Sequence, residues 1–275
     1  MRKLYSALKI ICLVALGITL ICLVAVIAYV LIKGTGKLSF DLLFGDYKSS
    51  PSILPAFVGM LELVAIASLI AVPIGVASAI FLVEYTNNKG KLVRIIQVAT
   101  ETLAGIPSIV YGLFGYLIFV VAFGWGYSII GGGITLAIMI LPTIVRSTQE
   151  SLLSVQGGLR EGSYALGASK VRTIFKIVLP SASGGIVTAI ILAIGRVVSE
   201  SAVLILTIGM VVNKVPQNLL SPGTSLALDI YYFASNGYRD EAAATSVVLL
   251  VFVIFLNLLA SGIGKLIKKS TGEEK

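Results

Sequence analysis

Six long apolar stretches, separated by polar segments, dominate this chain. A helix rises about 1.5 Å per residue and the hydrocarbon layer of a bilayer is about 30 Å thick, so about 20 apolar residues are enough to cross it. Helices satisfy their own backbone polar groups in lipid, and the stretches lack the alternation of barrel strands. The pattern predicts an all-α polytopic membrane bundle, one transmembrane domain over residues 1–275, with six transmembrane helices at 10–32, 56–83, 102–122, 127–145, 186–212 and 242–264.

The composition indicates that a bilayer is the solvent of this chain. Hydrophobic residues make up 57% of it, charged residues only 12%, and its mean hydropathy is +1.01. A water-soluble domain of this size could not bury so much apolar surface. The first stretch is too long for the core of a signal peptide and ends at Lys33 without a cleavage pattern, so it is expected to be a retained helix.

The net charge of +8 reflects topology, because the basic residues are distributed unequally between the two sides. Of the 21 Lys and Arg residues, Arg196 lies within a predicted span, and all but five of the others fall on the side of the N-terminus. The five on the opposite side are Lys33, Lys37, Lys48, Lys214 and Arg239. Basic loops stay in the cytoplasm, so we predict a multi-pass protein of the plasma (inner) membrane with both termini cytoplasmic, and no nucleic-acid partner.

Three prolines fall inside predicted spans, namely Pro73, Pro107 and Pro142. Each removes an intrahelical hydrogen bond and tends to kink its helix, which in a bundle can frame a cavity. Proline is also commoner in membrane helices than in soluble ones, so no single one of them indicates a cavity.

Residues 146–180 form the longest polar stretch between two spans on the predicted cytoplasmic side. Gly157-Gly158 breaks the chain, apolar residues spaced for short amphipathic helices follow, and Pro180 is expected to close the segment before the fifth span. The pattern fits either an interfacial helix on the lipid headgroups or an element that docks a soluble partner.

Within this segment the chain resembles the EAA signature of ABC importer permeases, E-A-A-x3-G-x9-I-x-L-P. Glu161-Gly162-Ser163, Gly167 and Ile177-x-Leu179-Pro180 match every fixed position except the two alanines. The resemblance implies a type I ABC importer permease fold and a cytoplasmic coupling helix that lies in a groove of the ATP-binding subunit. The residues expected to dock there are Glu161, Gly162, Ser163, Tyr164, Ala165, Leu166, Gly167 and Ala168.

Other stretches are similar to phosphate-specific permeases. They are residues 105–115 (GIPSIVYGLFG) and 195–202 (GRVVSESA), and residues 229–234 (DIYYFA) with Asn257 resemble the PstA type more than its PstC-type companion. The resemblance implies import of inorganic phosphate with a PstC-type second permease, two copies of an ATP-binding subunit and an external phosphate-binding protein. ATP and Mg would bind the ATP-binding subunit, and no cofactor or metal is expected on this chain.

The sequence has no phosphate cradle of its own for hydrolysing ATP. Gly36-Lys37, Gly90-Lys91 and Gly264-Lys265 all lack the leading glycine of the GxxxxGK[ST] motif. We therefore expect a transport subunit without enzymatic activity. The alternatives are a self-sufficient secondary transporter, for which we find no internal repeat, and a permease for another oxyanion. An intramembrane enzyme is disfavoured, because the chain has no histidine and no acid–base constellation in its spans.

Two charged residues in the fifth predicted span are candidates for the substrate pathway. Arg196 is expected near the middle of that span, where an arginine costs about 2.5 kcal/mol or more and must face protein, water or substrate. Glu200 follows four residues later, on the same face of a continuous helix. The two could form an ion pair that holds the bundle together. Given the resemblance, we expect instead that Arg196 contacts phosphate through its planar fork of donors and that Glu200 orients it.

A second candidate pair lies at the predicted cytoplasmic boundary. Glu101 opens the third span and Arg146 ends the fourth. The two could pair as a gate in the pathway, or Arg146 could follow the preference of basic residues for the membrane interface.

Overall fold

The computed structural model describes residues 2–45, 47, 51–86 and 90–271, and this part of the chain is entirely helical. The elements in order are α1 (Arg2–Thr35), α2 (Phe40–Phe44), α3 (Leu54–Ile80), η1 (Phe81–Tyr85), α4 (Lys91–Ala104), α5 (Ser108–Gly115), η2 (Tyr116–Ala122), α6 (Ile129–Leu153), α7 (Gly157–Ala165), α8 (Lys170–Thr173), η3 (Ile174–Val178), α9 (Leu179–Val198), α10 (Ala202–Thr207), α11 (Leu226–Ser235) and α12 (Arg239–Thr271). The three η segments are π-helical and continue an adjacent α-helix. The predicted all-α class is confirmed.

Five helices of the described chain are long and apolar enough to cross a membrane. They are Leu8–Thr35, Leu54–Tyr85, Ile129–Leu153, Lys170–Val198 and Arg239–Gly264. A sixth crossing is possible if the bent pair Val93–Ala104 and Ser108–Ala122 forms one span. Pro73 and Pro142 both lie inside continuous helices.

The third predicted span is not a single helix over 102–122. Its first three residues belong to the end of α4, residues 108–122 form α5 and η2, and these two helical parts meet at an angle of 98°. Pro107 causes the break, because it disfavours helical backbone in the residue before it and itself adopts an extended ψ of 140°. The Tyr111 hydroxyl, one turn into α5, donates to the carbonyl oxygen of Leu103 at 2.8 Å and fixes the bend.

The fifth span also differs from the predicted range of 186–212. Its helix begins at Lys170 and ends at Val198, so Pro180 lies inside it instead of closing the polar segment before it. The helix accommodates the proline because π-helical η3 immediately precedes it. The apolar residues after the helix end belong to short α10 and a loop, and Val203, Leu204 and Ile208 are completely buried. They are apolar because they pack in the protein core.

The fourth predicted span, 127–145, continues two turns further than expected. Ser128 caps the start of α6 by accepting a hydrogen bond from the Gly131 amide at 3.3 Å. The helix then passes through Arg146 and ends at Leu153. The first part of the predicted polar segment 146–180 is therefore helical and continuous with the span.

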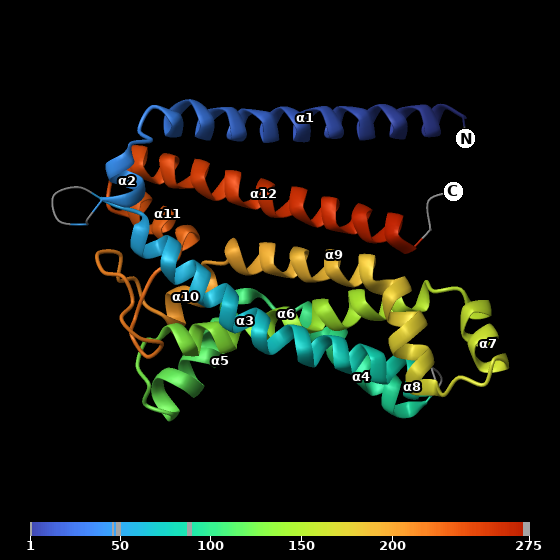
Figure 1. Cartoon of the computed structure of the whole chain (residues 1–275). Coiled ribbons are helices and arrows are strands. Elements are labelled where there is room, and N and C mark those ends of the chain that lie inside the picture. Colours follow the sequence, from blue (N-terminus) through green and yellow to red (C-terminus); the bar gives the residue numbers. More distant parts are fainter. Residues whose placement is uncertain (1, 46, 48–50, 87–89, 272–275) are drawn as a thin grey trace.

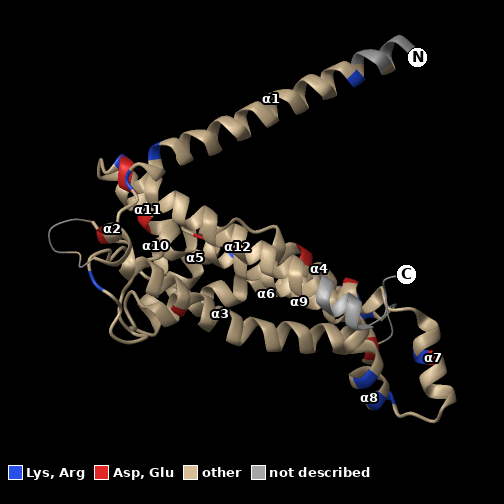
Figure 2. Ribbon diagram, turned by 45° about the horizontal axis from the view of Figure 1, so that its top comes forward, with Lys and Arg blue, Asp and Glu red and all other residues tan. Residues whose placement is uncertain are grey.

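Helices α3, α6 and α9 form the centre of the bundle, with α12 and then α1 outside them (Figure 1). Close packing of α3 against α6 depends on Gly75, where an added Cβ would lie 2.7 Å from Ile144 Cγ2. Helix α1 diverges from the rest of the chain (Figure 2), and Gly34, against Ala243 of α12, is its only buried residue among those described. Short α7 lies at the end of the bundle where α1 begins and α12 ends (Figure 1).

Candidate functional site

Arg196 lies in the last turn of α9, two residues before the helix ends, and not near the middle of a span as predicted. Its side chain is exposed, and no carboxylate oxygen of the described residues lies within 4.0 Å of it. Tyr111 of α5 is close enough for the arginine charge to act on its hydroxyl. Among the described residues this guanidinium therefore has no carboxylate partner, and it lies near Tyr111 at the bend between α4 and α5.

Glu200 does not share a helix face with Arg196, because α9 has already ended. Its Oε1 accepts hydrogen bonds from the amides of Ala202 at 3.0 Å and Val203 at 3.3 Å. A carboxylate at this position satisfies free amides at the start of α10 and interacts favourably with the helix dipole. The expectation that Glu200 lies on the helix face of Arg196 is therefore wrong, and the alternative of an ion pair between them is not seen among the described residues.

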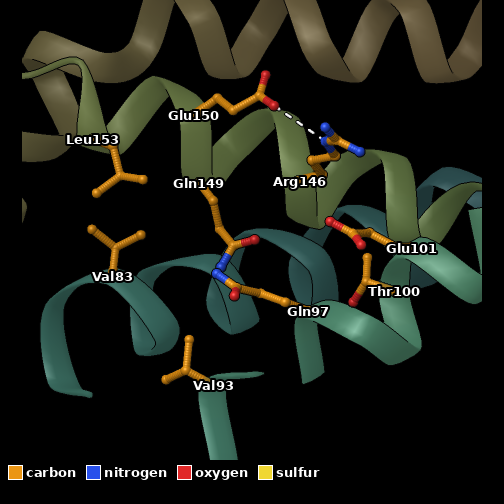
Figure 3. A pocket seen from close by; sticks show the side chains of 9 residues that line it. All are labelled: Val83, Val93, Gln97, Thr100, Glu101, Arg146, Gln149, Glu150 and Leu153. Carbon is orange, nitrogen blue, oxygen red and sulfur yellow. Dashed lines mark hydrogen bonds and ion pairs between the residues drawn. The ribbon is translucent and has the colours of Figure 1, made fainter. Parts of the chain in front are cut away.

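Glu101 and Arg146 do come together, in a cleft of about 380 Å³ between α4 and α6. Figure 3 shows Thr100 and Glu101 on the α4 side, below Arg146 on α6. The residues lining the cleft are Val83, Val93, Gln97, Thr100, Glu101, Arg146, Gln149, Glu150 and Leu153. The cleft thus offers one guanidinium, two carboxylates, two amides and a hydroxyl to a polar solute.

The ion pair in this cleft is not the Glu101–Arg146 pair that we considered as a gate. Arg146 Nε donates to Glu150 Oε1 at 3.2 Å, one turn further along α6, with both side chains mostly exposed. Four other residues of the cleft were not predicted from the sequence, namely Gln97, Thr100, Gln149 and Glu150. The signal was available in part, because Gln97, Thr100 and Glu101 are spaced for one face of a helix.

The predicted docking residues occupy α7 and the turn after it. Glu161, Gly162, Tyr164 and Ala165 are exposed on α7, and Leu166 has 91% of its surface exposed. Gly167 follows with φ of +79°, a left-handed conformation that favours glycine, and Ala168 is half-buried. Ser163 alone is buried, with its Oγ 2.8 Å from Thr173 Oγ1.

An ion pair that was not predicted from the sequence holds α7 against the bundle. Arg160 of α7 donates from Nη2 to Glu84 Oε1 at 2.9 Å and from Nε to the same oxygen at 3.2 Å. Nearby, Lys170 Nζ lies 4.9 Å from the centre of the Tyr85 ring. Arg160 and Glu84 are 76 residues apart, so no local sequence pattern could indicate their pairing.

A buried acid lies apart from the cleft, in α11, outside the candidate spans. Asp229 is fully buried, accepts a hydrogen bond from the Thr224 hydroxyl on Oδ1 and has no partner for Oδ2 among the described atoms. Burial raises the pKa of this carboxyl to about 8, against the opposing effect of the Thr224 hydrogen bond. Burial, with Tyr232 and Asp229 nearby, also raises the pKa of Tyr47.

Comparisons with known proteins agree with the geometry. A family model described as the binding-protein-dependent transport system inner membrane component matches residues 71–272. The chain is 36% identical over 268 residues to the probable ABC transporter permease protein YqgI of Bacillus subtilis (strain 168), and the match covers 90% of each protein. It is 34% identical over 206 residues to the phosphate transport system permease protein PstA of Xylella fastidiosa (strain 9a5c), covering 74% of this chain and 71% of that relative.

A solved structure of the MetNI methionine ABC transporter, in inward-facing conformations, contains a chain with the same fold. The TM-score is 0.63 at 20% sequence identity, and the match covers 76% of this chain and 93% of that one. At this identity the likeness is evidence for the fold alone. It confirms the prediction of a helical bundle similar to ABC importer permeases.

Proposed function

Because this chain belongs to the family of binding-protein-dependent transport system inner membrane components, we propose that it is a permease subunit importing inorganic phosphate. Family membership makes it the non-catalytic, multi-pass membrane component of an ABC importer, which works with an ATPase and a binding protein. A self-sufficient secondary transporter is therefore not supported. The phosphate substrate is the proposed part.

Two kinds of observation support phosphate. Several relatives at 34–40% identity, each matching part of this chain, are named phosphate transport system permease protein PstA. The observation that carries the proposal is the exposed Arg196 guanidinium, which has no carboxylate partner among the described residues. A phosphate oxyanion accepts hydrogen bonds only, and the planar guanidinium can donate two to it at once.

The cleft is the second place at which phosphate would contact the protein on the proposed path. Arg146 offers a positive charge there, while Glu101 and Glu150 on the same walls are negative. Their combined charge disfavours a tightly held anion, so phosphate passing from Arg196 would not be trapped. We assign Glu200 to holding α10 in place, because its carboxylate caps that helix.

The proposed assembly follows the family pattern. In it α7 and both termini face the cytoplasm, and the segment from Glu161 to Ala168 docks on one of two ATP-binding subunits, which bind ATP and Mg. Exposed Tyr164 and Leu166 supply apolar contact area for that docking. A PstC-type permease completes the pathway, and an external phosphate-binding protein delivers the ion.

Uptake of radiolabelled phosphate by the reconstituted importer tests the substrate. We expect Arg196→Ala to reduce uptake at least tenfold with the complex still assembled, and Arg196→Lys to retain part of it, because lysine keeps the charge and loses the fork. Arg94→Ala, which removes an exposed arginine outside the cleft, is the matched control. Normal phosphate uptake by Arg196→Ala would contradict the role of Arg196. Equal competition by sulfate would favour a permease for another oxyanion.

A further inference from the structure

Arg160 connects three parts of the bundle through one largely buried side chain. Besides its two bonds to Glu84, it donates from Nη1 to the carbonyl oxygen of Val155 and from Nη2 to that of Leu152, each at 2.8 Å. Its side chain is 20% exposed and that of Glu84 is 7% exposed. The arginine belongs to α7 and its carboxylate partner to η1 at the end of α3. Its carbonyl partners are Leu152 in the last turn of α6 and Val155 just after that helix.

This arrangement differs in kind from an ordinary surface ion pair. Exposed pairs such as Arg146–Glu150 contribute little, because water screens them and mobile side chains must be ordered. A shielded guanidinium with its donors engaged on fixed partners has a defined geometry. It also donates charge-assisted hydrogen bonds to carbonyl groups at the C-terminal end of α6, where a positive charge interacts favourably with the helix dipole. Arg160 therefore holds α7 in one position relative to α3 and α6.

The anchor points of Arg160 adjoin the cleft. Glu84 follows Val83 and Leu152 precedes Leu153, and both Val83 and Leu153 line the cleft. Figure 3 shows the Val83 and Leu153 side chains facing each other at one end of it. A displacement of α7 would therefore be passed through Arg160 to the two helix ends that form this part of the cleft wall.

We propose that Arg160 and Glu84 are positioning residues that transmit movement of α7 to the cleft between α4 and α6. The inference rests on the proposed docking of α7 on the ATP-binding subunit, but not on phosphate as substrate. The exposed Tyr164 and Leu166 hold the ATP-binding subunit, whereas the inward-facing Arg160 carries its movement to α3 and α6. Loss of the Arg160–Glu84 pair should stop movement of the ATP-binding subunit from reaching α3 and α6, while that subunit stays bound to α7.

A cysteine reporter at the cleft tests this directly. Leu153→Cys is introduced into the full importer with Cys12→Ser and Cys22→Ser, since both natural cysteines are exposed on α1. The rate at which a thiol reagent labels this cysteine is measured with and without ATP and Mg, in the absence of phosphate. Variants are Arg160→Gln, Glu84→Gln and the double variant, with Lys37→Ala at the separate Lys37–Glu241 pair as control.

We expect ATP to change the labelling rate several-fold with natural Arg160 and Glu84, and in the Lys37→Ala control. Each single variant should reduce that change at least fivefold while keeping the ATP-binding subunit bound and hydrolysing ATP within about twofold of normal. The double variant should be no worse than either single one, as for residues acting as one unit. These results together would support transmission of α7 movement to the cleft through Arg160 and Glu84.

Three results would overturn the proposal: an unaltered ATP response in Arg160→Gln and Glu84→Gln, release of the ATP-binding subunit from both, or an equal loss in Lys37→Ala. Glu84→Gln keeps a hydrogen-bond acceptor beside Arg160, so it separates loss of the pair from misfolding of α7. If ATP has no effect even with Arg160 and Glu84 intact, the proposed docking of α7 fails instead. Because labelling of the Leu153→Cys variant is measured without phosphate, the result does not depend on whether the importer transports phosphate.

Discussion

Ser163 and Thr173 join α7 to α8 through a buried contact of 2.8 Å between their hydroxyl oxygens. Thr173 also donates to the carbonyl oxygen of Ser169 at 3.1 Å, so it retains a partner if Ser163 is removed. The contact places Ser163, like Arg160, on the inward-facing side of α7 and leaves the exposed residues of this helix available for docking. In the EAA signature this position is an alanine, which is also small enough to be buried there.

Ser163→Ala should therefore be tolerated, at a cost of about 1 kcal/mol or less, because Thr173 stays satisfied. Ser163→Leu should displace α7, because a large side chain cannot enter the buried site without moving α8. Copurification of the ATP-binding subunit measures both effects. Equal copurification with both variants would show that the position of α7 does not depend on this contact.

Gly162→Ala should strengthen α7 by about 0.5–1 kcal/mol, since alanine is the better helix former and an added Cβ meets nothing within 4 Å. The matched change is Gly167→Ala. It also meets open space, but φ at Gly167 is +79°, so it should destabilise the turn. Melting temperatures of the purified importer should move in opposite directions. A shift in the same direction would contradict the α7 geometry.

Tyr111→Phe should loosen the bend between α4 and α5. It removes the hydroxyl that donates to the Leu103 carbonyl, worth about 1 kcal/mol, and keeps the ring in the core. The distance between spin labels on exposed Ile95 and Leu113 should become more broadly distributed. Tyr116→Phe, whose hydroxyl makes no side-chain hydrogen bond within the described chain, serves as control. An unchanged distribution in Tyr111→Phe would mean that Pro107 alone fixes the angle.

Asp229 should make stability fall as pH rises. Its pKa is about 8 when folded and about 3.9 when unfolded, so between these values the folded chain keeps a proton that the unfolded chain has lost. Stability from this group is therefore full below about pH 4, declines up to about pH 8 and is constant above.

Asp229→Asn removes that dependence while keeping an oxygen for the Thr224 hydroxyl. Its melting temperature should match that of the unaltered chain at about pH 4 and below, and exceed it at pH 8. A gain of about 1 kcal/mol would correspond to roughly 2–4 °C. The difference between the two melting curves isolates Asp229 from other titrating groups. A constant difference at all pH values would contradict the raised pKa.

The apolar pattern was sufficient to predict the helical class and most crossings, but it could not distinguish lipid-facing from buried segments. Val203, Leu204 and Ile208 are as apolar as a span, so the fifth helix was extended past Val198. That error also placed Arg196 mid-membrane and Glu200 on its helix face. The break between α4 and α5 could be expected from the sequence, because Pro107 itself disrupts the helix there.

Residues far apart in the chain were beyond this kind of reasoning. Glu101 and Arg146 were placed at the same boundary from topology, and they do share a cleft. Which carboxylate Arg146 contacts depends on side-chain reach, and Glu150 on its own helix is the nearer partner. The Arg160–Glu84 pair depends on how α7 packs against η1 at the end of α3, which only the three-dimensional structure shows.

The π-helical turns η1 and η3 lie on either side of α7 in the sequence. A π turn accommodates one residue more than an α turn, so it can migrate along a helix while the residues it passes change phase by about 100°. If the π turn at η1 moved along the helix in this way, Glu84 would rotate away from Arg160 and α3 would remain helical. A shift of this kind at η1 or η3 would change which residues of α3 or α9 face their neighbours, while the helix itself stays unbroken.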